Sequence, residues 1–361
     1  MDKSVTTADR ANPILSAGAV LQNRYRVVRQ LGRGGMGAVY EAVDERLGVT
    51  VALKEALSTG DHLRRQFDRE ARMLAQLHHP ALPRVSDYFL EGERAFLVMQ
   101  FIAGVDLASI IAQQPGPFPR NQVIAWADQL LDALIYLHSL DRQIIHRDIK
   151  PHNLKLTSAG KIALLDFGLA KTEPANSSDV NSAPSIFGYT RRYAPLEQIQ
   201  HEGTTPRSDI YALGATLYHL LTGIKPPDAL ERAAALVNSK PDPLKAANEI
   251  HRNVGSELAA ILDKAMAQNP QHRYASADEF REALRRLGRV DDSADPDRKE
   301  SERQDNGAAP QTAGETTVLR SQPAQPPISE VGDKPLLEDS LRVESATRIV
   351  RPFLQVLKPG R

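Results

Sequence analysis

Two patterns of apolar residues divide the chain into a strand-rich first part and a helix-rich second part. Short β-branched and apolar runs within residues 25–55, YRVVRQL, AVYEAV and VTVALKE, predict three strands. VSDYFL and RAFLVM, separated by a Glu-Gly-Glu turn, predict a hairpin over residues 85–99. Between these strands one amphipathic helix is predicted over residues 62–77, because apolar residues recur there at intervals of three and four: Leu63, Phe67, Ala71, Leu74 and Leu77.

The second part has the longer apolar periodicity of helices. Residues 121–140 form one broad apolar face, with Val123, Ala127, Leu130, Leu131, Leu134 and Leu137. Residues 208–223 are apolar nearly throughout, which predicts a helix buried on all sides. Further helices are expected at residues 228–238, 255–267 and 276–287. The pattern therefore predicts an α+β protein with a small antiparallel sheet followed by a mainly helical region.

Both ends of the chain lack this periodicity. Residues 1–23 are polar and mixed, which predicts a flexible leader, and residues 289–361 have few apolar residues, which predicts a mostly disordered tail. We expect one folded domain over residues 24–288, with a first lobe at 24–99 and a second at 103–288.

Composition narrows the classes of function. Lys plus Arg and Asp plus Glu are 45 each, so no whole-chain basic field indicates nucleic acid or a membrane surface. There is no cysteine, which excludes disulfides and thiolate chemistry. No apolar run reaches the roughly 18–20 residues of a membrane span. A cytoplasmic protein is the expectation.

Candidate chemistry is densest in IHRDIKPHNLKLTSAGKIALLDFG, residues 145–168. Phosphoryl transfer needs a carboxylate to orient a hydroxyl, oxygen ligands for magnesium and a cation near the moving phosphate. Asp148, Lys150, Asn153 and Asp166 could supply these groups. The alternative is a β-hairpin with a polar turn.

A second motif, Gly32-Arg-Gly34-Gly-Met-Gly37, could bring backbone amides close to phosphates. A dinucleotide-binding fold is the alternative, but it requires a helix directly after the glycines, whereas a strand-like run follows here. Lys54 comes on the third strand, and Glu70 beside the apolar stripe of the helix at 62–77 is its natural partner, with a surface charge as the alternative.

Together, His-Arg-Asp-x-Lys-x-x-Asn, Asp-Phe-Gly, the glycine loop and Val-Ala-Leu-Lys resemble the signature set of protein kinases, and Lys150 makes the chain similar to serine/threonine kinases instead of tyrosine kinases. The Gly-Gly-Met-Gly loop and the compact linkers resemble the bacterial Hanks-type branch. The resemblance implies a two-lobed fold, with a five-stranded sheet and one helix in the first lobe and ATP between the lobes. It also implies transfer of the γ-phosphoryl group of ATP to Ser/Thr hydroxyls of protein substrates, with Mg²⁺ or Mn²⁺.

The resemblance implies a role for each matched residue. Asp148 would be the catalytic base, Lys150 would neutralise the γ-phosphoryl group, and Asn153 and Asp166 would hold the metal. The nucleotide would be bound by Gly32, Gly34, Gly37, Val39, Ala52, Lys54, Glu70, Met99, Gln100, Ile102 and Asp106. Asp106 would contact the ribose, and capping of the following helix is an alternative that is compatible with it.

By the same resemblance, residues 169–197 are the activation segment, where Thr190, Tyr193 and Glu197 would build the substrate floor. Candidate sites of autophosphorylation, for which two copies could associate, are Ser177, Ser178, Ser182, Ser185 and Thr190. Arg147 would receive such a phosphate, Asp209 would hold the catalytic loop, and Arg273 would pair with Glu197. In the tail, Thr316 and Thr347 are candidate docking marks for a phosphothreonine-reading domain.

Three positions depart from the family pattern: Gln100 in the hinge between the lobes, Leu196 in Ala-Pro-Leu-Glu, and Lys155 where an apolar residue beneath adenine is expected. The rival functions are a pseudokinase that acts as a scaffold and a small-molecule kinase of related fold. The complete set of Lys54, Glu70, Asp148, Asn153 and Asp166 disfavours the first, and the expected peptide floor disfavours the second.

Overall fold

The computed structural model describes residues 14–34, 37–56, 61–92, 94–166 and 191–293, and for Gly34, Ala56, Glu70 and residues 61–66 and 288–293 it describes the course of the backbone alone. The chain divides into two units, residues 1–287 and 288–361. The features below belong to the first unit. The predicted phosphorylation sites in residues 177–190 and the tail threonines Thr316 and Thr347 lie outside the described residues.

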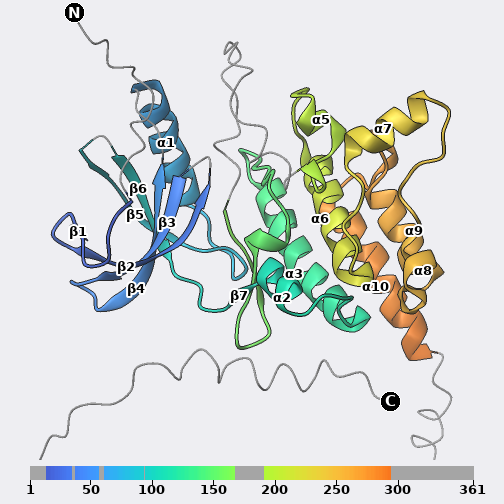
Figure 1. Ribbon diagram of the computed structural model, residues 1–361, viewed down its shortest axis with the longest axis horizontal. Helices are drawn as coiled ribbons and strands as arrows, with labels where there is room; N and C mark the ends of the chain where they lie inside the picture. Colours follow the sequence, from blue (N-terminus) through green and yellow to red (C-terminus); the bar gives the residue numbers. More distant parts are fainter. Residues whose placement is uncertain (1–13, 35–36, 57–60, 93, 167–190, 294–361) are drawn as a thin grey trace, which may run out of the picture. The chain divides into compact units, whose positions relative to one another are not determined.

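The first lobe is built on a six-stranded antiparallel sheet of order β1-β2-β3-β4-β6-β5 (Figure 1). Its strands are β1 (Val20–Leu21), β2 (Tyr25–Gly34), β3 (Gly37–Asp44), β4 (Val49–Ala56), β5 (Val85–Glu91) and β6 (Arg94–Gln100). Along β3, buried residues alternate with partly exposed ones, as expected for a strand with one face on a core. Helix α1 (Asp61–Leu74) packs beside β5 and β6, where the Phe67 and Tyr88 rings lie 5.6 Å apart.

The strand β1 corrects the expectation of a flexible leader over its last ten residues, and makes the sheet six-stranded instead of five-stranded. The Gly18 N–H donates to the carbonyl of Val27, and the Val27 N–H donates to the carbonyl of Ala19, both at 2.8 Å. Leu15, Ala19 and Leu21 pack against the sheet core. The segment is ordered because its few apolar residues cover the end of this core, which a composition average over residues 1–23 does not reveal.

The second lobe is mainly helical. It begins with β7 (Val105–Asp106), α2 (Leu107–Gln113), α3 (Arg120–Ser139), η1 (Pro151–Asn153), β8 (Leu154–Leu156) and β9 (Ile162–Leu164). It continues with α5 (Leu196–Ile199), α6 (Pro206–Thr222), α7 (Ala229–Val237), α8 (Ala247–Ile250), η3 (Arg252–Val254), α9 (Ser256–Ala265), η4 (Pro270–His272) and α10 (Ala277–Ser293). The short strands β7, β8 and β9 form a second antiparallel sheet.

Helices α3 and α6 form the centre of this lobe. All six predicted apolar positions of α3 are buried, and α6 is buried from Ser208 to Thr222, as its sequence predicted. A close approach also fixes the path between the lobes. A side chain at Gly104 (φ +148°) would collide with the carbonyl oxygen of Leu156 on β8, so glycine is required where the chain passes from β6 into the second lobe.

Candidate active site

The loop after α3 is held from below by Asp209, near the first turn of α6. The Asp209 carboxylate accepts the backbone N–H groups of His146 (2.8 Å) and Arg147 (2.9 Å), and lies 2.9 Å from His138 Nε2. Its side chain is fully buried, so these contacts satisfy a charge that would otherwise be costly. Arg147 adopts a left-handed backbone conformation (φ +66°), which is uncommon for a residue other than glycine. Asp209 therefore holds the loop backbone, as the sequence predicted.

Three predicted catalytic residues, Asp148, Lys150 and Asn153, contact one another within the loop that Asp209 holds. Lys150 Nζ lies 3.0 and 2.9 Å from the two carboxylate oxygens of Asp148. Asn153 Nδ2 donates to the Asp148 carbonyl oxygen (2.7 Å) and to Asp148 Oδ2 (2.9 Å). The Asp148 carboxylate is thus fixed by two neighbours from the same loop. Because both amide hydrogens of Asn153 are used, its Oδ1 is the atom that could ligate a metal.

Asp166 and Lys54 bring the two lobes together at this site. Lys54 Nζ, on β4, lies 3.3 Å from Asp166 Oδ1. Asp166 follows β9 with φ +55°, a second strained backbone position beside the reacting groups. The Leu165 N–H donates to the carbonyl of Asn153 (2.8 Å), which ties the segment of Asp166 to the catalytic loop. The side chain of Glu70 lies outside the described part of the chain, so its pairing with Lys54 stays a prediction.

The predicted nucleotide-binding positions lie on adjacent strands of the first lobe. Gly34 pairs with Gly37 at the end of the β2–β3 hairpin, and Gly37 has φ +146°, a conformation that favours glycine. Val39 pairs with Lys54, and Ala52 pairs with Met99. The sheet register therefore brings the glycine hairpin, Lys54 and the end of β6 onto neighbouring strands.

The segment after β6 contains the remaining predicted contacts. Gln100 ends this strand, and its N–H donates to the carbonyl of Arg84 at 2.8 Å. Asp106 caps α2, accepting the N–H (2.8 Å) and hydroxyl (2.6 Å) of Ser109. The capping role of Asp106 is thus confirmed, while its ribose contact and the adenine contacts of Gln100 and Ile102 stay predictions.

Lys155, the unusual residue of the catalytic stretch, lies on β8 directly opposite Asp106 of β7. Its Nζ is 5.2 Å from the centroid of the Phe101 ring. Burial lowers the pKa of Lys155, with Asp106 acting in the opposite direction. The ammonium group is therefore directed to the aromatic ring and the carboxylate beside the interlobe segment.

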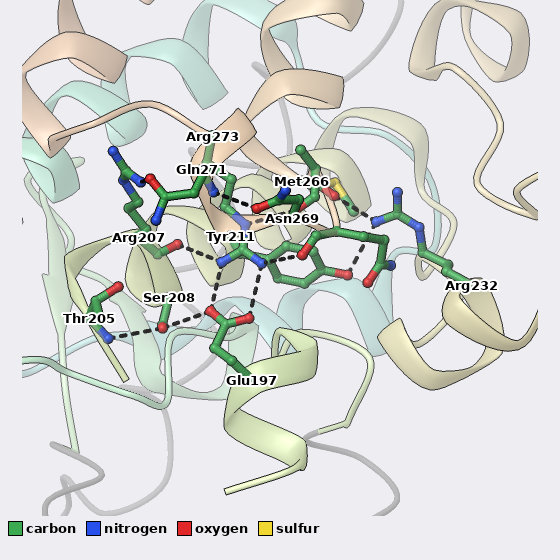
Figure 2. A network of polar contacts seen from close by, with 12 residues as sticks. Glu197, Thr205, Arg207, Ser208, Tyr211, Arg232, Met266, Asn269, Gln271 and Arg273 are labelled. Carbon is green, nitrogen blue, oxygen red and sulfur yellow. Dashed lines mark hydrogen bonds and ion pairs between the residues drawn. The ribbon is translucent and has the colours of Figure 1, made fainter. Parts of the chain in front are cut away.

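A buried network holds the segment that ends in α5. Figure 2 shows Glu197 of α5 pointing at the guanidinium of Arg273, to which it is bound at 2.7 and 3.0 Å. Ser208 Oγ donates to Glu197 Oε1 (2.8 Å). Burial raises the pKa of Glu197, but the bonds from Arg273 outweigh it and the net shift is downward. The predicted Glu197–Arg273 pair is confirmed.

The same segment touches the catalytic loop and α6. Gln198 Nε2 donates to the carbonyl of Arg147 at 2.8 Å. The hydroxyl of Tyr193 lies 2.8 Å from Nδ1 of His219, which is buried on α6. Burial lowers the pKa of His219 to about 4, with smaller effects of the same sign from Lys225 and His152. Thr190, the third predicted floor residue, lies outside the described residues.

Sequence reasoning missed two contacts of this region. His219 was counted only as a residue of a buried helix, and no spacing signal links it to Tyr193. Arg147, expected to receive a phosphate, donates from its Nε to the hydroxyl of Thr204 at 2.7 Å. The Tyr193–His219 and Arg147–Thr204 contacts join segments that are far apart in the sequence, so local periodicity cannot predict them.

Comparison with known proteins agrees with this geometry. A family model described as "Protein kinase domain" matches residues 25–285. The chain belongs to the protein kinase family, in its bacterial Hanks-type serine/threonine branch.

Individual relatives are bacterial. The chain is 36% identical over 272 residues to serine/threonine-protein kinase pkn2 of Myxococcus xanthus, which covers 72% of this chain and 32% of that protein. It is 32% identical over 278 residues to serine/threonine-protein kinase PknA of Mycobacterium tuberculosis, which covers 74% of this chain and 62% of that protein. The chain thus spans about a third to three fifths of the length of these curated relatives.

A solved structure described as "PpkA-294 apo form" superposes with a TM-score of 0.61 at 30% identity, covering 75% of this chain and 99% of that one. This agreement confirms the two-lobed kinase fold. Within the described residues, no helix has the length and apolarity needed to cross a membrane.

Proposed function

We propose that the protein is an ATP-dependent serine/threonine protein kinase that transfers the γ-phosphoryl group of ATP to hydroxyl groups of proteins. The observation that carries the proposal is the Asp148 carboxylate, fixed by Lys150 and Asn153 within a loop that Asp209 supports from below. A carboxylate held in this way can orient an acceptor hydroxyl and take its proton.

The donor set fits a divalent metal and a nucleotide. Asn153 Oδ1 and the Asp166 carboxylate are hard oxygen ligands on segments that the Leu165–Asn153 hydrogen bond joins. A divalent metal bound there, Mg²⁺ in our proposal, would neutralise charge on the phosphate oxygens. Lys54 stands 3.3 Å from Asp166 and would hold the α- and β-phosphates, with Glu70 as its partner.

The protein's own contribution is positioning and electrostatics. Asp148 aligns the hydroxyl and accepts its proton. Lys150, already within 3.0 Å of Asp148, holds positive charge beside the oxygens that become more negative during transfer. The hairpin of Gly32, Gly34 and Gly37 excludes water from the phosphates, and Ile102, Gln100 and Asp106 hold the base and ribose.

We further propose residues 24–288 as the kinase domain and residues 289–361 as a tail outside it. The activation segment would be autophosphorylated within an association of two copies of the chain. A phosphothreonine-reading partner would recognise Thr316 or Thr347 in the tail. The intact Lys54, Asp148, Asn153 and Asp166 favour an enzyme over a pseudokinase that acts as a scaffold.

The deciding experiment incubates the full chain with Mg²⁺ and labelled ATP, with and without a generic protein substrate. We expect label on the kinase itself and on serine or threonine of the substrate. Asp148→Asn should lower transfer by at least about 100-fold, whereas Asp141→Asn, which changes an exposed aspartate just before the same loop, should retain it. Absence of transfer, or equal activity of Asp148→Asn and wild type, would contradict the proposal.

A further inference from the structure

The segment between α1 and β5 contacts the second lobe, although its sequence belongs to the first. The His78 N–H donates to the hydroxyl of Tyr136 on α3 at 2.9 Å. The Leu164 N–H, on β9, donates to the carbonyl of Ala81 at 2.8 Å. We call this segment, residues 75–84, the α1–β5 connection. Its position therefore depends on α3 and β9 as well as on the first lobe.

The ring of His79 is held within this connection by contacts on several sides. Its Nδ1 lies 3.1 Å from the backbone nitrogen of Ala81, so Nδ1 accepts the Ala81 N–H and the hydrogen of the neutral ring is on Nε2. Nε2 lies 3.1 Å from Oδ2 of Asp132, on α3. The ring also stacks on that of Tyr136, with 5.5 Å between the centroids, and the His79 side chain is only 9% exposed. The Nε2–H group is therefore directed to Asp132.

Asp132 divides its two carboxylate oxygens between this histidine and α10. Oδ2 faces His79, and Oδ1 accepts a hydrogen bond from Nη1 of Arg281. Arg281 is in turn fixed by Asp128, one turn earlier on α3, through Nε (2.7 Å) and Nη2 (2.9 Å). Burial raises the pKa of Asp132, but the bonds from His79 and Arg281 outweigh it and the net shift is downward. Arg281, Asp132 and His79, which we call the polar relay, thus join α10 to the α1–β5 connection.

The connection adjoins both elements that would act on Lys54. Leu164, which it binds, precedes Asp166 by two residues, and Lys54 Nζ lies 3.3 Å from Asp166 Oδ1. At its other end the connection continues α1, which carries Glu70, the proposed partner of Lys54. A shift of His79 would therefore move the groups that place the lysine against the nucleotide phosphates.

A neighbouring arginine makes it possible to separate the polar relay from ordinary packing of α10. Among the described residues, Arg285, one turn after Arg281, bonds to Asp128 alone, through Nε at 2.8 Å and Nη2 at 3.3 Å. Loss of Arg285 would loosen α10 from α3 while the contacts of Asp132 remain. Loss of Asp128 would loosen α10 further, because both arginines bind it, and would still leave the Arg281–Asp132 bond.

We infer that Asp132 and Arg281 are positioning residues of the kinase reaction, which act through His79 on the α1–β5 connection. Arg281 holds Asp132, Asp132 holds the imidazole, and the imidazole holds the connection against α3. Neither residue is among the predicted contacts of the nucleotide or of the acceptor hydroxyl, so their effect reaches the site through the backbone that they hold. The inference rests on the proposed function and extends its machinery to α3 and α10.

The test uses the full chain, Mg²⁺ and a fluorescent ATP analogue, whose dissociation constant Kd is measured without phosphoryl transfer. We expect Asp132→Ala and Arg281→Gln to raise this Kd roughly three- to tenfold, a range typical of residues that influence a site without contacting the ligand. The kcat on a generic protein substrate should fall at least as much, because the γ-phosphoryl group is then misplaced relative to Asp148. Arg281→Lys, which keeps a cation for Asp132, should restore most of the affinity.

Asp128→Ala and Arg285→Gln are the matched controls. Both should lower the free energy of unfolding in urea, Asp128→Ala at least as much as Arg281→Gln, while the Kd of the analogue stays at its wild-type value. The urea profiles also show which variants are folded under the assay conditions. Asp132→Asn, which keeps the size of the side chain and one acceptor, replaces Asp132→Ala should that variant fail to fold.

A double variant tests whether Asp132 acts through the histidine. His79→Leu alone should raise the Kd about as Asp132→Ala does. The two changes together should raise it no further than the larger single effect, because both interrupt the same path.

Wild-type values of Kd and kcat in Asp132→Ala and Arg281→Gln would overturn the inference and leave the kinase function standing. An equal loss of affinity in Asp128→Ala would also overturn it, since docking of α10 would then be the cause. Losses that multiply in the double variant would refute the path through His79. Failure of the wild-type chain to bind the analogue, with no transfer to any protein, would refute the proposed function itself.

Discussion

Arg273 and Glu197, 76 positions apart in the sequence, face each other through two nearly parallel hydrogen bonds of 2.7 and 3.0 Å. The arginine side chain is fully buried and that of Glu197 is 12% exposed. Arg273 also donates to the carbonyls of Ala267, Arg207 and Gln268. One side chain thus holds together α5, the start of α6 and the turn before α10.

Removing one partner of this pair should destabilise the fold. Arg273→Met leaves a buried carboxylate and three carbonyls without their donor, so we expect the free energy of unfolding to fall by roughly 3–5 kcal/mol. Urea denaturation measures this. Lys264→Met breaks the exposed Lys264–Glu279 pair, whose side chains are 44% and 46% exposed, and should cost less than about 1 kcal/mol. Similar losses in both variants would contradict the prediction.

Asp209 supports the catalytic loop without touching the reacting groups, so its loss should act through position. In Asp209→Asn an amide N–H₂ replaces one of the two acceptors that receive the His146 and Arg147 N–H groups. We expect kcat to fall roughly 10- to 100-fold, as a displacement of about 1 Å would cause.

The KM for ATP should stay within about threefold in Asp209→Asn, because the nucleotide contacts come mainly from the first lobe. Steady-state kinetics separates the two parameters. Asp278→Asn, an exposed position on α10, is the control. An unchanged kcat in Asp209→Asn would show that the loop is positioned without it.

Lys155 should be replaceable by an apolar residue. Its stem is half-buried on β8, and its ammonium contacts the Phe101 ring, a contact worth about 0.5–1 kcal/mol at an exposed site. We expect Lys155→Leu to leave turnover within a few-fold of wild type, with Lys155→Met behaving alike. A collapse of ATP affinity in either variant would refute the view that the stem serves as apolar packing beneath the base.

His219 makes stability depend on pH. Burial, aided by Lys225 and His152, lowers the pKa of His219 from 6.5 to about 4 in the folded protein. Between these values the unfolded chain binds more protons, so stability is fully present above pH 6.5 and declines as the pH falls toward 4. The decline due to this group should reach roughly 3 kcal/mol.

Chemical denaturation across pH 4–7 tests this linkage. His219→Gln, which retains a polar side chain opposite the Tyr193 hydroxyl, should show a flatter dependence than wild type. Tyr193→Phe should lower stability while retaining most of the slope, since it removes the hydroxyl and leaves the histidine buried. Parallel profiles for wild type and His219→Gln would contradict the assignment.

Periodicity was sufficient to predict the helices of the second lobe and the principal strands of the first, because each depends on residues within a few positions of one another. It failed at β1, where two residues and a few apolar neighbours leave no periodic signal. The catalytic motif could be recognised because Asp148, Lys150 and Asn153 are neighbours in sequence. Contacts such as Tyr193–His219 and Arg147–Thr204 depend on how distant segments pack, which spacing does not encode.

The two-residue strand β1 has a consequence for how the protein is handled. It pairs with Tyr25 and Arg26 on the side of β2 that faces away from β3. A shortened chain that begins at Tyr25 would leave those N–H and C=O groups at an open sheet edge, where a second chain could pair with them and start aggregation. It would also uncover the apolar residues that Leu15 and Ala19 shield. Loss of material during purification of such a fragment would therefore reflect an uncovered sheet edge in the first lobe, although every proposed catalytic residue would still be present in the chain.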